Sequence, residues 1–88
     1  MSRVTVDHDA DVPVYQQIAH IIKARIDAGQ IAPRRRIPSE STMVQEFGVA
    51  RVTARRAVAY MRQQGWVYTV PQRGTFVSEP EDEEPAGS

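Results

Sequence analysis

The chain has 88 residues, no cysteine, and eleven basic residues (Lys and Arg) against eleven acidic ones (Asp and Glu). This length suits one domain with a small core, and the lack of cysteine excludes disulfides, thiolate nucleophiles and cysteine-ligated zinc. No apolar run approaches the roughly 18 residues of a membrane span, and the N-terminus lacks the basic and apolar regions of a signal peptide, so we expect a cytoplasmic protein.

The charges are unevenly distributed along the chain. Residues 13–78 hold ten basic residues against three acidic ones, while residues 1–12 and 79–88 are both acidic. A basic body favours a polyanionic partner, and a merely solvated arginine face is the other interpretation. We predict a flexible N-terminal arm at 1–12, a folded domain at 13–78 and a disordered acidic tail at 79–88. The tail is either a solubilising linker or a segment that competes with phosphate for the arginines.

The first expected helix runs from Pro13 to Gly29, because proline is tolerated in a first turn and glycine suits a helix end. Apolar residues recur at helical spacing and predict one buried face. They are Val14, Ile18, Ile21, Ile22 and Ile26. His20 lies off this face and is expected to be exposed. Three aspartates around His8 predict a solvated segment, since no distant residue completes a metal-coordination set.

A proline-bracketed connector and a short helix follow. Residues 32–38 carry three consecutive arginines between two prolines, and neither end can continue a helix. Ser39 is a suitable N-cap, and Glu40 lies in the first turn, where the helix dipole favours negative charge. We predict a helix from Glu40 to Phe47 with one face against the core. The residues of that face are Met43, Val44 and Phe47.

The next helix carries the main candidate surface. Gly48 suits the turn after the preceding helix and Gly65 suits the end of this one, so we predict a helix over residues 51–64. Helical spacing divides it into two faces. The core face has Ala54, Ala57, Val58 and Met61, and the outward face has Arg51, Val52, Arg55 and Ala59. Two helices joined by a glycine-containing turn, the second with arginines near its start, are typical of a helix-turn-helix.

A β-hairpin is expected after Gly65. Residues 66–70 and 75–77 are rich in β-forming side chains, and residues 71–74 form a polar turn between them. The arginine and the glycine of this turn suit close approach to a phosphate backbone. The order of elements predicts a winged helix-turn-helix, which is a mostly α three-helix bundle with a small antiparallel β-hairpin as the wing.

Four short motifs in this order resemble a known family. They are residues 13–18 (PVYQQI), 37–40 (IPSE), 47–53 (FGVARVT) and 73–77 (RGTFV). From Pro13 to Val77 the chain resembles the DNA-binding domain of the GntR (gluconate-repressor type) bacterial transcription regulators. The resemblance implies sequence-specific binding of double-stranded operator DNA by a transcriptional regulator, and specifically by a repressor.

The resemblance also implies roles for residues of the third helix. It places helix 51–64 in the major groove, where Arg51 and Arg55 reach bases or phosphates. It further implies that Thr53 and the backbone near Ala50 contact phosphate. Val52 stands where the family often has threonine, so it is a candidate for contact with a thymine methyl group.

The wing and the connector complete the candidate site. The family pattern implies that the 71–74 wing lies near the minor groove through Arg73 and Gly74, with Gln72 in place of a frequent glycine. Ser41 stands where the family usually has arginine, and Arg56 where glutamate is frequent. The remaining candidate DNA contacts are Arg36 and Ser39. These departures predict an operator that differs from the common family half-site.

Other functions are less well supported by the residues. A winged helix that binds another protein is the alternative, with Trp66, Tyr68 and Tyr60 as its anchor. We expect no enzyme, because there is no glycine-rich phosphate loop and no serine with a plausible histidine base. We also expect no cofactor, no metal and no small-molecule effector domain in this chain, and a monomer that pairs as a homodimer on palindromic DNA.

Overall fold

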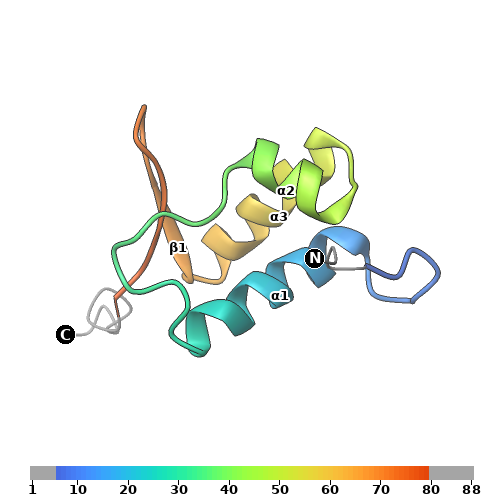
Figure 1. The fold of residues 1–88 in the computed structure, drawn as a ribbon, viewed down its shortest axis with the longest axis horizontal. Helices are drawn as coiled ribbons and strands as arrows, with labels where there is room; N and C mark the ends of the chain where they lie inside the picture. Colours follow the sequence, from blue (N-terminus) through green and yellow to red (C-terminus); the bar gives the residue numbers. More distant parts are fainter. Residues whose placement is uncertain (1–5, 80–88) are drawn as a thin grey trace.

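The structure, a computed structural model, describes residues 6–79 and contains the predicted elements in the predicted order (Figure 1). The helices are α1 (Val14–Asp27), α2 (Glu40–Phe47) and α3 (Arg51–Gln63), and the strands are β1 (Val67–Val70) and β2 (Gly74–Val77). The helices pack together and the hairpin projects from one end of the bundle. The predicted winged helix-turn-helix is therefore confirmed.

Local capping fixes the helix-turn-helix. The Ser39 hydroxyl accepts the backbone amide of Thr42 at 3.1 Å, which satisfies one of the free donors at the start of α2. Gly48 ends α2 in the left-handed conformation with φ of 67°. Because only glycine adopts this conformation without a steric penalty, it allows the chain to turn sharply and begin α3 after Ala50.

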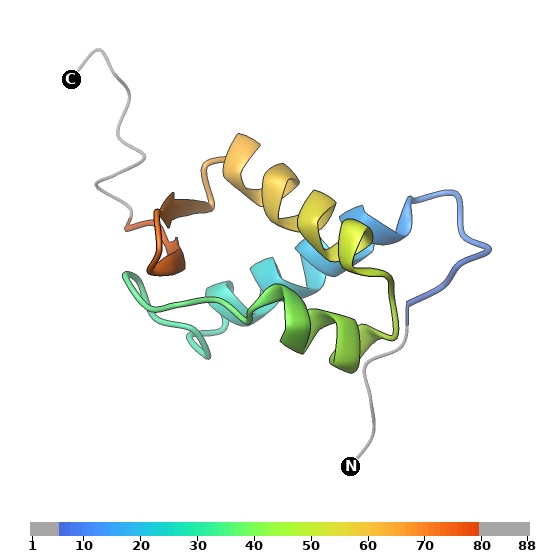
Figure 2. The same cartoon turned by 90° about the horizontal axis from the view of Figure 1, so that it is seen from above.

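The core lies between α1 and α3, with α2 on one side and the base of the hairpin at one end, an arrangement that Figure 2 shows from above. All four residues predicted for the core face of α3 are buried. On α1, Ile18 and Ile22 are fully buried, and the other three residues of the predicted face are half-buried around them. α2 contributes Met43 and Phe47, while Val44 packs at the margin.

The wing has a third extended segment, which the sequence did not predict. β1 and β2 pair in antiparallel register, with Val67 opposite Val77. In addition, the amide of Ile37 donates to the carbonyl of Thr75, and the amide of Val77 donates to the carbonyl of Arg35, both at 2.9 Å. The connector between α1 and α2 is therefore hydrogen-bonded along β2.

The described part of the N-terminal segment packs against the domain. Val6 is buried in the core with 7% of its surface exposed. The side-chain oxygen of Gln17 accepts a hydrogen bond from the backbone amide of Asp7 at 2.8 Å. Its side-chain nitrogen donates to the backbone carbonyls of Asp7 and Val12 at 2.7 and 2.8 Å. The packed unit thus includes Val6, ahead of the predicted boundary at Pro13. Residues 1–5 of the predicted flexible arm and residues 80–88 of the predicted disordered tail lie outside the described residues.

A half-buried ion pair ties α1 to α2. Both terminal guanidinium nitrogens of Arg25 pair with the Glu46 carboxylate, and Nη1 lies 3.3 Å from Oε1. The Arg25 guanidinium also lies 5.8 Å from the centre of the Phe47 ring.

Within residues 6–79, no helix combines the length and the apolar character needed to cross a membrane.

Candidate nucleic-acid interface

The first half of α3 presents a basic surface to solvent. Its exposed residues are Arg51, Val52, Arg55 and Arg56, while Thr53 and Ala59 are half-buried. Ala50 precedes the helix without a side-chain cap, and the first turn contains no acidic residue. No side chain of α3 therefore pairs with the free amides at this end or offsets the positive end of the helix dipole.

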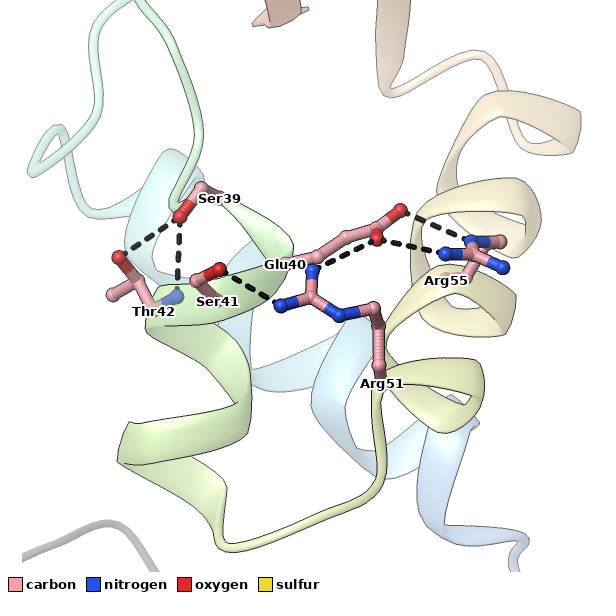
Figure 3. A network of polar contacts seen from close by, with 6 residues as sticks. All are labelled: Ser39, Glu40, Ser41, Thr42, Arg51 and Arg55. Carbon is pink, nitrogen blue, oxygen red and sulfur yellow. Dashed lines mark hydrogen bonds and ion pairs between the residues drawn. The ribbon is translucent and has the colours of Figure 1, made fainter.

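Arg51 and Arg55 converge on one carboxylate of the neighbouring helix (Figure 3). Nη1 of Arg51 lies 3.6 Å from Oε1 of Glu40, and Nη2 of Arg55 lies 3.4 Å from the same oxygen. Nε of Arg55 lies 3.5 Å from the other carboxylate oxygen of Glu40. We call Glu40, Arg51 and Arg55 the Glu40 fork. It holds two guanidinium groups side by side at the start of α3.

The members of the Glu40 fork remain accessible. Arg51 and Arg55 have 55% and 62% of their side-chain surface exposed, and Glu40 has 30%. Exposed pairs of this kind contribute only about 0–1 kcal/mol each, so another anion can replace the carboxylate at low cost. α3 itself contains no acidic residue. The partner of both arginines comes from α2, where Glu40 was interpreted from the sequence only through the helix dipole.

The two serines of the candidate site have different environments. The Ser39 hydroxyl accepts a hydrogen bond from the Thr42 amide and donates one to the Thr42 hydroxyl at 3.0 Å. Ser39 is therefore the cap of α2, as predicted. The Ser41 hydroxyl accepts a hydrogen bond from Nη2 of Arg51 at 3.1 Å. Ser41 therefore supports the orientation of the Arg51 guanidinium, whereas Ser39 is occupied by its own helix.

The wing tip brings Arg36 beside Gly74. Gln72 adopts a left-handed φ of 67° and Gly74 a φ of 127°. A Cβ atom on Gly74 would lie 3.2 Å from Cδ of Arg36. The Arg36 guanidinium also lies 5.9 Å from the centre of the Phe76 ring. Glycine at position 74 thus leaves room for the Arg36 side chain along the wing, next to the exposed Arg73.

A groove of 340 Å³ separates the wing from the start of α2. Arg36, Arg73, Gly74 and Thr75 line it on the wing side, and Ser39 and Glu40 line it on the helix side. Candidate residues that are far apart in the sequence therefore face one common depression. Of the Glu40 fork only Glu40 lines this groove, and Val58 lines it from α3, so α2, α3 and the wing border the same open surface.

Arg56 does not join the Glu40 fork. Its guanidinium lies 4.5 Å from the centre of the Tyr15 ring on α1. The anchor predicted for the alternative function is also divided. Tyr60 and Trp66 meet edge to face with ring centres 5.9 Å apart, whereas Tyr68 stacks on Phe76 in the wing at 6.0 Å. Tyr60 also contacts the rings of Tyr15 and His20, and these two contacts were not predicted.

Arg34 links the connector to the wing and to the start of the acidic tail. Its Nη1 donates to the Tyr68 hydroxyl at 3.4 Å, and its Nε pairs with the Glu79 carboxylate at 3.3 Å. Arg34 adopts a left-handed φ of 69°. This backbone conformation favours glycine, yet an arginine adopts it here.

This chain is similar to a family of bacterial regulatory proteins and to named transcriptional repressors. Residues 14–77 match the model of the bacterial regulatory proteins of the gntR family. The HTH-type transcriptional repressor NagR of Bacillus subtilis (strain 168) is 33% identical over 81 residues, which cover 92% of this chain and 33% of NagR. The arabinose metabolism transcriptional repressor of Geobacillus stearothermophilus is 36% identical over 73 residues, which cover 83% of this chain and 20% of that protein. The chain thus spans a third or less of the length of these relatives.

Solved structures share the fold as well. The crystal structure of AraR(DBD) in complex with operator ORX1 superposes with a TM-score of 0.80 at 33% identity, covering 89% of this chain and 99% of that one. YtrA from Sulfolobus acidocaldarius, a GntR-family transcription factor, gives a TM-score of 0.77 at 28% identity, covering 89% of this chain and 82% of YtrA. The family match and the shared winged helix together show that this chain belongs to the GntR family of bacterial regulatory proteins.

Proposed function

We propose that this chain is a sequence-specific reader of double-stranded operator DNA in a transcriptional repressor. In this proposal α3 enters the major groove and the wing approaches the minor groove. The role is one of binding and not of catalysis, in keeping with relatives that are named transcription regulators. The winged helix of residues 13–78 is the binding unit, and the cytoplasm is the compartment in which we expect it to work.

The Glu40 fork is the observation that carries the proposal. It presents two adjacent guanidinium groups, with side chains 55% and 62% exposed, at the end of α3 that carries the positive helix dipole. Arginine donates two parallel hydrogen bonds to the O6 and N7 atoms of guanine, and each good pair contributes about 1–3 kcal/mol of discrimination against other bases. On binding, guanine or phosphate oxygens take the place of the Glu40 carboxylate.

Neighbouring groups suit the phosphate backbone. The uncapped amides near Ala50 and the Thr53 side chain lie where α3 would meet one strand. Across the groove, Arg36 and Arg73 border the surface between α2 and the wing. The further candidate contacts are Ser39, Ser41, Arg56, Gln72 and Gly74. Such contacts fix the orientation of the protein on the duplex, whereas base contacts select the sequence.

The proposed assembly on DNA is a homodimer on a palindromic operator. A reader of one half-site gains affinity and selectivity when a second copy occupies the other half-site one helical turn away. The repressor relatives are three or more times as long as their matched segment, so the regulation of the whole protein is proposed only by analogy with them.

Selection of bound sequences from a random duplex pool tests this function. The wild-type chain should enrich a palindromic motif, and Arg51→Ala should lose it. Lys23→Ala is the matched control, because it removes the same charge beside Trp66, near the other end of α3. Enrichment that survives Arg51→Ala, or that is lost equally with Lys23→Ala, would contradict the proposed reading surface.

Salt dependence provides a second readout of the same function. With roughly four to six phosphate contacts, the slope of log affinity against log salt concentration should be about −4 to −5. Fluorescence anisotropy with a labelled duplex measures this slope between low and physiological salt. An affinity that does not change with salt would refute DNA as the partner.

A further inference from the structure

Val52 is an unusually exposed apolar side chain. Among residues 6–79 the exposed large hydrophobic side chains are Val12 and Val52, with 39% and 58% of their surface exposed. Val52 lies in the first turn of α3, within the basic surface described above. Apolar area that faces solvent in the free protein gains stability when a partner covers it. A branched hydrocarbon among arginines therefore favours a partner that offers both phosphate and a methyl group.

The geometry of α3 directs Val52 away from the domain. Successive helix residues are rotated by about 100°, so Val52 lies on the side of the helix opposite Met61, which is fully buried. Arg51 and Arg55 lean toward Glu40 of α2, and Arg56 leans over Tyr15 of α1. Val52 is thus the outermost residue between two groups of arginines that are directed to either side of it.

From this position we propose that Val52 is a specificity-determining residue that packs against the 5-methyl group of a thymine in the operator half-site. This inference rests on the proposed DNA-binding function. Thymine is the base that carries a methyl group in the major groove, and small apolar side chains recognise it by contact. Arg51 and Arg55 read guanine beside it, so the half-site contains guanine and thymine close together.

The chemistry of valine makes this contact selective. Valine has no hydrogen-bonding group and so pairs with neither the O4 of thymine nor the amino group of cytosine, but thymine offers it a methyl group where cytosine has only a ring hydrogen. In a helix the valine side chain strongly prefers one rotamer, so its two methyl groups are already fixed when DNA arrives. Little side-chain freedom is lost on contact, in contrast to a long flexible side chain.

Removal of single methyl groups from the DNA tests the inference. Each thymine of one half-site of the selected motif is replaced in turn by deoxyuridine, which lacks only the 5-methyl group. Burial of one methyl group changes the affinity by about fourfold. We expect one thymine at which deoxyuridine weakens the wild-type chain by about fourfold and leaves Val52→Ala unchanged. On unmodified DNA, Val52→Ala should itself bind about fourfold more weakly.

Val12→Ala is the matched control, since it truncates the other exposed large hydrophobic side chain, outside α3. It should retain the full sensitivity to deoxyuridine. Circular dichroism melts should show all three chains equally folded, because truncation of an exposed side chain has little effect on stability.

Two further results separate the inference from the function on which it rests. A motif in which no thymine is sensitive to its methyl group, or in which Val52→Ala keeps the same sensitivity, overturns the role of Val52 alone. Such a result would leave its exposed surface to a protein partner. Failure to enrich any motif refutes the DNA-reading function and this inference with it.

Discussion

Replacement of Glu40 by glutamine tests whether the Glu40 fork prepares α3 for base recognition. Glutamine keeps the size of the side chain and removes the charge that faces Arg51 and Arg55 at 3.4–3.6 Å. Two accessible ion pairs of about 0–1 kcal/mol each are lost, so the free energy of unfolding should fall by no more than about 2 kcal/mol. The larger effect should appear in DNA binding.

Two effects of the substitution on DNA affinity oppose each other. Each arginine carries about 2 kcal/mol of rotamer entropy, and without the carboxylate more of it is lost when Arg51 and Arg55 order on a base. Conversely, removal of a negative charge from the basic face favours contact with any phosphate. We therefore expect non-specific affinity to rise about three- to fivefold while the two opposing effects leave operator affinity about unchanged. The ratio of operator affinity to non-specific affinity should then fall by about three- to fivefold.

Anisotropy titrations of wild type and Glu40→Gln measure this ratio on an operator duplex and on a scrambled duplex of equal length. Glu46→Gln is the matched control, because it removes the same charge from α2 but at the ion pair with Arg25. Its ratio should stay within about twofold of wild type. An unchanged ratio in Glu40→Gln, or an equal gain on both duplexes, would refute the orienting role and leave Glu40 as a simple charge effect.

Three further substitutions test other parts of the fold. Gly74→Ala should lower the free energy of unfolding by about 1–3 kcal/mol in a urea melt, because it forces a side chain into a left-handed backbone beside Arg36; an unchanged melt would contradict this strain. Val6→Ala should cost about 1.5 kcal/mol through loss of buried methyl groups, whereas no loss would show that the segment does not contribute to the core. Trp66→Ala removes a half-buried ring packed on Tyr60, so it should cost about 2 kcal/mol, less than the roughly 3–5 kcal/mol of a fully buried ring, but leave operator affinity within twofold. A loss of affinity at a temperature where the variant is folded would implicate the aromatic cluster in binding.

Most of the fold could be predicted because its signals are local. The face of α1 around Ile18 and Ile22 and the face of α3 around Met61 follow from apolar residues at helical spacing. The turn at Gly48 follows from a conformation that glycine alone adopts without strain. Each of these signals lies within a few residues, so no knowledge of the tertiary packing was needed.

The parts that could not be predicted depend on contacts between distant residues. Nothing near Glu40 in the sequence indicates that it meets two arginines of the next helix, since the distance is set by how α2 crosses α3. Val6 has only Val4 as an apolar neighbour in the first nine residues apart from Met1, and this pattern is too short to predict its burial. Tyr68 does not pack with Tyr60 and Trp66 as predicted. It follows the buried Val67 in β1, and because successive strand residues face opposite sides of a sheet, its ring lies on the outer side of the wing against Phe76.

The hydrogen bonds between the connector and β2 have a consequence for how the surface can be changed. Ile37 is hydrogen-bonded to β2, and α2 begins at Glu40, so only Pro38 and Ser39 connect the wing to the start of α2. A link of two residues allows little relative movement. The separation between the wing and the start of α2 is therefore already fixed in the free protein. A chimera that exchanges the wing with a relative must exchange residues 34–37 together with residues 67–77 to preserve that spacing.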